Sequence, residues 1–406
     1  MTSAPVSIPS RQTSTPPDAT LAGLPVELAD SVEACQQLRE PWLRLRERCG
    51  VQSPNTDPDR FLAVVGAMDD ARPHLVLLGP RESPRAMIVA RTSRRRAAYR
   101  LGYLKFPSPV LRALDVVYEG LLTDGQPDSF MLALAHLVGY LRRRAFDTVS
   151  FNHLRLEQAH SVISNVRRAV VDPPELHWRF ELVPRSYEHT IARLSPRDRS
   201  NIRRKAKRLT THFKGNVRLR LFTREDELDE FMSGAVGIIA GGYQGALQVG
   251  LQDNALWRAM LSADACSRRL RCYWLEANGE PIAHETGAVY ANTYHGYATA
   301  FLPKYHALSP GQMLLIRVIE DLCAVGVRCI DWGFGDAEYK RIYGTECWVE
   351  QSVRLYGRTA RATVAWLLDV AVTQAASGLK SVAERLGTLR RIKNAWRRRM
   401  SRDDDR

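Results

Sequence analysis

The chain has 406 residues, of which 45% are hydrophobic and 25% charged, as in an ordinary globular protein. This composition excludes a wholly disordered, collagenous or membrane-embedded protein. The net charge of +14 comes from two segments, because residues 193–208 hold eight basic side chains against one acidic, and residues 380–402 hold nine against one. The rest of the chain is close to neutral, which argues against a general nucleic-acid-binding role.

Residues 25–185 predict a first α/β unit. Before it, residues 1–24 are rich in Pro, Ser and Thr and have no apolar core, so we expect a disordered tail rather than a secretory signal. Residues 31–48 have helical periodicity with a break expected at Pro41, and a short helix follows over 57–68. Strands, a long helix over 128–144, another strand and a helix over 156–170 come next, and the strand LHWRFELV ends the unit.

Residues 186–357 repeat a similar order of elements. Helices are expected over 186–194, 196–213, 225–242 and 255–270, with the strand VRLRLFT between the second and the third, and three strands follow over 271–301. The clearest helix begins at Ser309 as N-cap with Pro310 at its first position, and ends at Gly326. A strand, a glycine loop, a short helical turn and a last strand complete the unit. Residues 358–406 predict a basic helical tail.

Seven cysteines occur without a CxxC pair or a zinc-ligand spacing, so we expect reduced thiols, no metal and a cytosolic location. No apolar run reaches the roughly 20 residues of a membrane-spanning helix.

The motifs HExxH, GxSxG, GxGxxG and the Walker A loop are absent from the sequence. These absences argue against a zincin, an α/β hydrolase, a Rossmann dehydrogenase and a P-loop NTPase.

The helix that begins at Ser309 is a candidate anion site. Its first backbone N–H groups lack partners within the helix, and its dipole favours negative charge there. Lys304 lies just before it and could reach a phosphate. The alternative is a helix cap with no ligand.

The segment that follows supplies candidate catalytic groups. Asp331 and Asp336 flank a glycine loop at a strand end, where ligands collect in α/β sheets. Asp331 could deprotonate a nucleophile, and Lys340 could stabilise negative charge. The alternative is a structural turn with Asp336 as helix cap and a solvated lysine.

His284 and Glu285 alternate on a strand, so only one of them faces a cleft on a given side. We take His284 as the candidate base because its intrinsic pKa suits proton transfer. The alternative is a structural histidine.

Of the two basic segments, 193–208 could bind a phosphate-rich ligand or form a solvated helix face, and 380–402 could lie on an anionic membrane or be a frayed soluble helix.

Several motifs resemble one known family, the CelD-like group of GNAT-superfamily acyltransferases, which is named for cellulose biosynthesis. The motifs are Ser309-Pro-Gly311, Asp331-Trp-Gly-Phe-Gly-Asp336 and Glu338-Tyr-Lys-Arg-Ile-Tyr-Gly344, with support from Gln52-Ser-Pro54, Leu194–Leu209 and Asn278-Gly-Glu-Pro-Ile-Ala283. The likeness covers roughly residues 25–356. The usual GNAT pyrophosphate loop is not intact, since Tyr305–Gly311 holds one glycine in its place.

The resemblance implies an α/β (α+β) fold of tandem GNAT-like domains, at 25–185 and 186–357, with a basic helical tail. It implies transfer of an acyl group other than an aminoacyl group from acetyl-CoA or another acyl-CoA to an amine or hydroxyl. The context it implies is bacterial envelope, exopolysaccharide or cellulose biosynthesis, in the cytoplasm or at the inner membrane face, with contact to a synthase complex through the tail. The expected catalytic residues are Asp331, Lys340 and His284, and the expected donor-binding residues are Ser309, Gly311, Gln312, Lys304 and Tyr339.

Two other functions stay open. Fem-type transferases share the tandem fold and take an aminoacyl group from tRNA, and the basic segment 193–208 could serve that acidic donor. A non-enzymatic scaffold of a polysaccharide synthesis complex would bind neither CoA nor tRNA.

Overall fold

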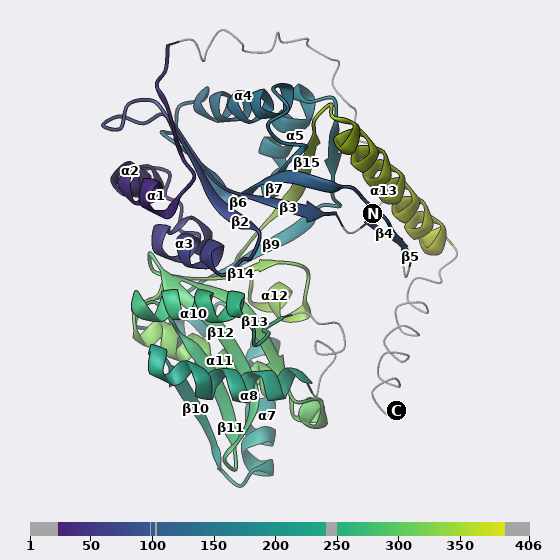
Figure 1. The fold of residues 1–406 in the computed structure, drawn as a ribbon. Helices are drawn as coiled ribbons and strands as arrows, with labels where there is room; N and C mark the ends of the chain where they lie inside the picture. The colour runs from purple at the N-terminus through teal and green to yellow at the C-terminus, as the bar shows by residue number, and fades with distance from the viewer. Residues whose placement is uncertain (1–22, 98, 102–103, 241–249, 386–406) are drawn as a thin grey trace.

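The computed structural model describes residues 23–97, 99–101, 104–240 and 250–385 (Figure 1). The expected N-terminal tail, apart from Gly23 and Leu24, and the part of the basic tail beyond Arg385 lie outside the described residues. Within the described residues, no helix has the length and apolar character needed to cross a membrane.

One mixed sheet of thirteen strands runs through the described part of the molecule (Figure 1). The strand order is β1-β2-β3-β6-β7-β15-β9-β14-β13-β12-β11-β10, with β8 beside β15, and β4 and β5 form a separate ribbon. The strands are β1 (Val26–Ala29), β2 (Ala71–Leu78), β3 (Ala86–Arg96), β4 (Tyr99–Leu101), β5 (Leu104–Phe106), β6 (Val110–Thr123), β7 (Thr148–Arg155), β8 (Ala169–Val171), β9 (Glu175–Glu181), β10 (Val217–Phe222), β11 (Cys272–Ala277), β12 (Glu280–Tyr290), β13 (Thr293–Phe301), β14 (Cys329–Phe334) and β15 (Glu346–Tyr356).

Helices cover both faces of this sheet. They are α1 (Val32–Gln37), α2 (Arg39–Arg48), α3 (Pro58–Gly66), α4 (Ser129–Arg142), α5 (Leu156–Asn165), α6 (Tyr187–Ala192), α7 (Pro196–His212), α8 (Leu228–Ala240), α10 (Ala255–Cys266), α11 (Pro310–Ala324), α12 (Glu338–Tyr343) and α13 (Ala360–Arg385). Short 3₁₀ helices are η1 (Pro54–Thr56), η2 (Glu225–Glu227) and η3 (Pro303–Leu308). The sequence-based elements are largely confirmed, and the mixed α/β fold is as expected.

Two local expectations were wrong. The break in the first helical segment lies at Leu38, between α1 and α2, and Pro41 sits inside the first turn of α2. Proline is tolerated there because the N–H groups of the first turn have no partner within the helix. The second is the expected helix over 156–170, which ends at Asn165, and Ala169–Val171 pair with β15 as a strand.

In the N-terminal half, alternate strand residues serve two separate cores. Leu75 and Leu77 of β2 pack toward α1, α2 and α3, whereas Val76 and Leu78 pack toward α4 and α5. All four side chains are fully buried. The period of two along a strand therefore joins both helical layers to one sheet.

The C-terminal half has the same three-layer construction. Phe222, Cys272 and Trp274 pack against α8 and α10 on one face. On the other face, Tyr273, Leu275 and Ile330 pack against α7 and α11 in the largest apolar cluster given by the described residues. In Figure 1 the two halves lie above and below one another, with the sheet continuous between them.

The two halves exchange their last strands. β9, from the end of the N-terminal half, pairs with β14 of the C-terminal half, and β15, from the end of the C-terminal half, pairs with β7. β9 and β15 also pair with each other. Each half therefore completes its sheet with a strand that the other half supplies.

A buried polar cluster also joins the halves. Arg60 of α3 is 4% exposed and donates a hydrogen bond to the Tyr297 hydroxyl at 2.6 Å, and that hydroxyl donates to Asp264 of α10 at 3.0 Å. Arg269 forms an ion pair with Asp57 at 2.6 Å across the same boundary. Because each charge is paired, this contact holds the halves in a fixed relation.

Candidate functional site

The parallel strands β13 and β14 pair over only three residues and then separate. Thr293–His295 of β13 pair with Cys329–Asp331 of β14, and no further register follows between them. A cavity of about 860 Å³ lies at this opening, lined by Thr299, Ala300 and Phe301 of β13 and by Trp332 of β14. Strand ends next to a helix N-terminus are the usual place for ligands in α/β sheets.

The cavity brings together residues from six further elements. They are Asn201 and Lys205 of α7, Ile238 and Ile239 of α8, Glu285 of β12, Pro303, His306 and Ser309 beside η3, Gly311, Gln312 and Leu315 of α11, and Glu338, Tyr339, Ile342 and Tyr343 of α12. Four of the five expected donor-binding residues, Ser309, Gly311, Gln312 and Tyr339, therefore lie around one cavity.

The N-terminus of α11 faces this cavity. Ser309 has left-handed backbone angles (φ 56°), and its side chain makes no capping hydrogen bond, so the expected side-chain cap was wrong. The Gln312 and Met313 amides instead donate to the Ser309 carbonyl, at 3.1 and 3.3 Å. A strained residue at the entrance of a helix is typical of a functional turn.

Two neighbours make this helix end suited to a ligand. A Cβ on Gly311 would lie 3.2 Å from the Phe301 ring, so glycine keeps the cavity open here. The Gln312 Oε1 atom is buried and has no hydrogen-bond partner among the described residues. A buried acceptor without a partner, beside the positive end of the helix dipole, fits a ligand that carries both donors and negative charge.

Glu285 lines the cavity, whereas His284 does not. Glu285 is 9% exposed, and burial raises its pKa to about 8, against the smaller opposing effects of a hydrogen bond with Thr299 and the Lys340 charge. His284 is fully buried beside Phe231 of α8, where burial lowers its pKa to about 3. Strand alternation correctly placed the two side chains on opposite faces, and the face that meets the cavity is that of Glu285 and not that of His284, the base expected from the sequence.

Lys340 does not line the cavity either. It is 5% exposed, and its Nζ atom donates to three backbone carbonyls, those of Trp332 at 2.9 Å, Gly333 at 3.3 Å and Phe334 at 2.6 Å. An ammonium group has three donors, and all three are used. Lys340 therefore fixes the last residues of β14, and we infer a positioning role for it in place of the catalytic role expected from the sequence.

We expect the substitution Lys340→Met to lower the free energy of unfolding by about 1–3 kcal/mol, because the three carbonyls lose their donor. Urea denaturation measures this change. Arg341→Met is the control on the same helix, since its exposed pair with Asp336 contributes at most about 1 kcal/mol. Equal stability of the two variants would contradict the positioning role.

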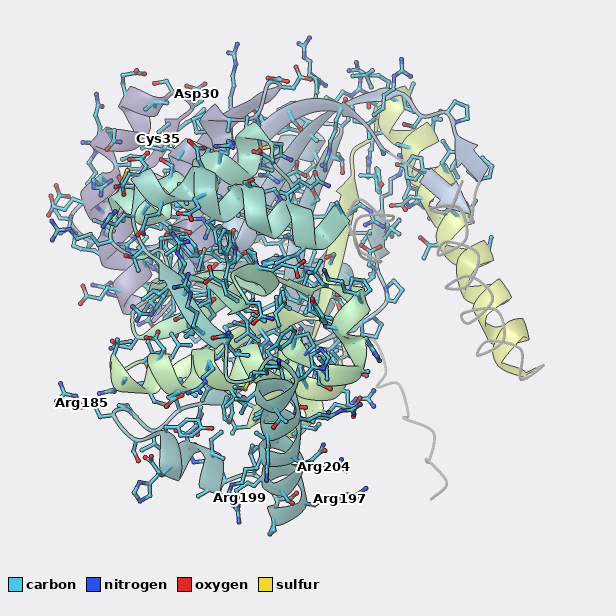
Figure 2. The ribbon with its side chains drawn as sticks, turned by 90° about the horizontal axis from the view of Figure 1, so that it is seen from below. Asp30, Cys35, Arg185, Arg197, Arg199 and Arg204 are labelled. Atoms are coloured by element: carbon cyan, nitrogen blue, oxygen red, sulfur yellow. The ribbon has the colours of Figure 1, made fainter. Side chains whose placement is uncertain are left out.

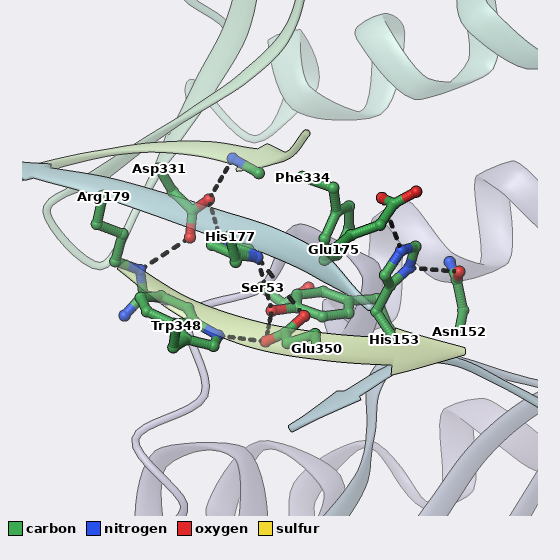
Figure 3. Close-up of polar contacts among 12 residues, drawn as sticks. Ser53, Asn152, His153, Glu175, His177, Arg179, Asp331, Phe334, Trp348 and Glu350 are labelled. Carbon is green, nitrogen blue, oxygen red and sulfur yellow. Dashed lines mark hydrogen bonds and ion pairs between the residues drawn. The ribbon is translucent and has the colours of Figure 1, made fainter. Parts of the chain in front are cut away.

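Asp331 is the centre of a buried network behind the cavity (Figure 3). Its carboxylate accepts from Arg179 at 2.9 Å and from the Gly333 amide at 2.9 Å, and lies 2.7 Å from His177 Nε2. Burial raises the pKa of Asp331, but the His177 hydrogen bond and the charges of His177, His295 and Arg179 hold that pKa well below its ordinary value. A carboxylate held in this way is a poor proton acceptor, so we infer a structural role for Asp331 in place of the general-base role expected from the sequence.

The network continues from His177 to Glu350 of β15. His177 Nδ1 lies 3.6 Å from Glu350 Oε2, and the Trp348 indole and the Tyr118 hydroxyl donate to the other oxygen of Glu350 at 2.5 and 3.1 Å (Figure 3). Burial lowers the pKa of His177, but the two carboxylates outweigh it and raise the pKa. No motif in the sequence indicates this cluster, since its members lie on four separate strands.

Lys304 is the fifth expected donor-binding residue, and it does not line the cavity. It forms an exposed ion pair with Glu280 at 2.6 Å. The basic group that does reach the cavity is Lys205 of α7.

The basic helix α7 lies beside the cavity. Its start is capped by Ser195, whose hydroxyl accepts from the Asp198 amide at 3.1 Å, and Ile202 and Leu209 anchor one face in the core. Arg197 and Arg204 line an open depression that shares Asn201, Glu338 and Ile342 with the cavity. Figure 2 shows Arg197, Arg199 and Arg204 on the outward end of this helix. An acidic ligand would thus meet positive charge next to the cavity.

Comparisons with known proteins agree with this geometry. Residues 196–341 match the family described as acetyltransferase (GNAT) domain. No curated protein sequence matches the chain significantly.

Among solved structures, FemX aligns over 81% of this chain and 98% of its own, with a TM-score of 0.56 at 7% identity. A tandem GNAT protein from the clavulanic acid biosynthesis pathway aligns over 81% and 98%, with a TM-score of 0.44 at 11% identity. A GCN5-related N-acetyltransferase from Sphaerobacter thermophilus aligns over 83% and 98%, with a TM-score of 0.41 at 10% identity.

These findings locate the family likeness in the half that holds the cavity. At such low identity the FemX likeness shows a shared fold and nothing about substrates. The narrower CelD-like resemblance stays a prediction. Residues 196–341, in the C-terminal half, are therefore similar to the GNAT acetyltransferase domain, within a mixed α/β fold that FemX shares.

Proposed function

We propose that the protein transfers an acyl group from acyl-CoA, with acetyl-CoA as the first candidate, to an amine or hydroxyl. The observation that carries this proposal is Glu285, a buried carboxyl group with a pKa of about 8 at the strand opening between β13 and β14. A base with a pKa close to physiological pH is suited to accepting a proton in the transition state.

In the proposed reaction the acceptor nitrogen or oxygen attacks the thioester carbonyl. The new C–N or C–O bond forms, the C–S bond breaks, and Glu285 takes the proton that the acceptor loses. Tyr339 also lines the cavity, and burial followed by the Glu285 charge raises its pKa, so its phenol stays protonated. Tyr339 can return a proton to the departing thiolate. Holding both substrates in one cavity supplies much of the rate.

The donor's phosphates fit the other end of the cavity. Negative charge is favoured at the N-terminus of α11, beside Ser309 and Gly311, and Lys205 faces the same space from α7. The donor's phosphates can bind here without the usual GNAT pyrophosphate loop, because the N-terminus of α11 and the cations of α7 provide the positive potential.

Acetyl-CoA binding to the full chain tests the proposal. Acetyl-CoA at one hundred times its Kd should stabilise the native state by about 2.7 kcal/mol, measured as a rise in Tm. Lys205→Met should weaken the Kd by about threefold to tenfold and reduce its salt dependence, since an exposed ion contact contributes about 1 kcal/mol.

Lys207→Met is the matched control, because Lys207 is an exposed cation of α7 that does not line the cavity. It should leave the Kd within about twofold of the wild type. No stabilisation of the wild-type protein by acetyl-CoA would remove the proposal.

One observation favours a second donor, an aminoacyl-tRNA of the kind that Fem-type transferases use. The basic side chains of α7 continue from Lys205 at the cavity to Arg197 and Arg204, which line the neighbouring depression together with Arg341. This alternative predicts tRNA binding whose affinity falls steeply with salt. Acetyl-CoA binding without tRNA binding would decide against it, and failure of both ligands would favour the scaffold role.

A bacterial envelope or exopolysaccharide pathway, a place in the cytoplasm or at the inner membrane face, and docking to a synthase complex through the C-terminal tail belong to the same proposal. They rest on the CelD-like resemblance. Deleting residues 386–406 and measuring co-purification with membranes tests the docking part.

A further inference from the structure

The N-terminal half contains a second strand opening of the same kind. β6 and β7 are parallel, as β13 and β14 are, and they pair only from Ala113–Val116 to Thr148–Phe151. Just beyond, Glu119 of β6 and His153 of β7 both have left-handed backbone angles, with φ of 57° and 53°. Non-glycine residues are strained in this region, and such positions concentrate at functional sites.

A small cavity of about 120 Å³ lies at this second opening. This is about four times the ~30 Å³ that one water molecule occupies in the liquid. Part of its wall is apolar and part is polar, and it shares no lining residue with the larger cavity. The apolar residues are Val51, Val116, Val117, Leu121, Phe151 and Leu154.

Two carboxyl groups line the cavity. Glu350 is 2% exposed, and its Oε2 atom has no hydrogen-bond partner among the described residues, since His177 Nδ1 is 3.6 Å away. Glu119 lies on the facing strand, and burial raises its pKa. The groups that oppose this rise, Arg179 and His177, act on Glu119 through their charge at a distance. Glu350 therefore keeps one oxygen without a hydrogen bond although it forms an ion pair with His177, whereas Glu119 has no ion pair among the described residues.

The other cations nearby already have partners. Arg179 is bound to Asp331 at 2.9 Å. Arg155, which lines the cavity, lies over the Trp348 ring at 4.6 Å from its centroid. No group of side chains suited to a metal ion is found among the described residues. The Glu119 carboxyl group has no ion-pair partner within the described part of the chain, and part of the cavity wall is apolar. These two properties favour the binding of an organic cation over a hydrated inorganic one.

We propose that this cavity binds the ammonium end of a small primary amine, with Glu119 and Glu350 accepting its hydrogen bonds and the valine and leucine side chains packing on its carbon chain. The site is distinct from the acyl-transfer cavity and does not depend on the function proposed for that cavity. It gives the N-terminal half a ligand-binding role of its own.

Titration of the full chain with n-propylammonium, followed by NMR or calorimetry, tests the proposal. We expect saturable binding, absent for the neutral 1-propanol and for the anion butyrate. Glu119→Gln should weaken the Kd about tenfold, the size of effect that loss of one charge-assisted hydrogen bond produces. Glu119 is the better substitution, because Glu350 also holds Trp348 and Tyr118 in place.

Glu157→Gln on α5 is the control, an exposed carboxylate of the same half that should leave the Kd unchanged. Binding that is equal in the Glu119→Gln variant, equal binding of 1-propanol, or no propylammonium binding up to about 0.1 M would each overturn the proposal. Acetyl-CoA binding by the Glu119→Gln variant should match the wild type. That measurement keeps a failure here separate from a failure of the acyl-transfer function.

Discussion

Glu285→Gln is expected to lower kcat by about 10²–10⁴-fold, the usual contribution of a positioned general base, while the protein stays folded. Glutamine keeps the shape of the side chain but cannot accept the proton. Steady-state kinetics with acetyl-CoA and an amine acceptor measures the loss. Glu280→Gln is the matched control, because Glu280 lies on the same strand and pairs with Lys304 outside the cavity.

The pH profile gives an independent check on Glu285. The base works only when it is ionised, and its pKa is raised to about 8. The wild-type rate should therefore rise about tenfold per pH unit below 8 and level off above it. The Glu285→Gln variant should lose this dependence. A profile that is the same in both proteins would mean that another group accepts the proton.

Asp331→Asn is expected to lower the free energy of unfolding by about 3–5 kcal/mol, the range found when one partner of a buried ion pair is removed. The substitution leaves His177 and the inner end of Arg179 without their counter-charge. Urea denaturation measures the change. Asp336→Asn, five residues along and exposed, should cost at most about 1 kcal/mol. A variant as stable as the Asp336 control would show that the network is not structural.

The same network should make stability depend on pH in both directions. The pKa of Asp331 is lowered on folding, so its stabilisation is present above about pH 4 and is lost as the pH falls further. The pKa of His177 is raised, so its stabilisation is present below about pH 6.5 and is lost as the pH rises through the folded value. Thermal unfolding from pH 3 to 9 should show both losses in the wild type. In Asp331→Asn the acid-side loss should be absent and the alkaline-side loss smaller, because Glu350 still faces His177.

Helices and strands whose ends are set by residues close by in the sequence could be predicted. The bounds of α11 follow from Pro310 at its start and Gly326 after its end, both of which act locally. Strand alternation separated His284 from Glu285 correctly. It could not tell which face would meet the cavity, because that depends on the opening between β13 and β14.

The roles of Asp331 and Lys340 could not be read from their motif. Their nearness in sequence suggested a shared catalytic cleft. In the structure, Asp331 bonds to His177 and Arg179, which lie on a strand about 150 residues earlier in the chain. The Lys340 ammonium group donates its hydrogen bonds to backbone carbonyls. A sequence motif shows which residues occur together but gives no information on partners that arrive through the fold.

The exchange of β9 and β15 has a consequence for synthesis on the ribosome. In the sheet, β15 (Glu346–Tyr356) lies between β7 and β9 and pairs with both. The N-terminal half therefore cannot complete its sheet until nearly all of the described chain has been made. Until then the edges of β7 and β9 stay unpaired and open to wrong partners. Folding of the sheet should therefore be completed only after β15 has been made.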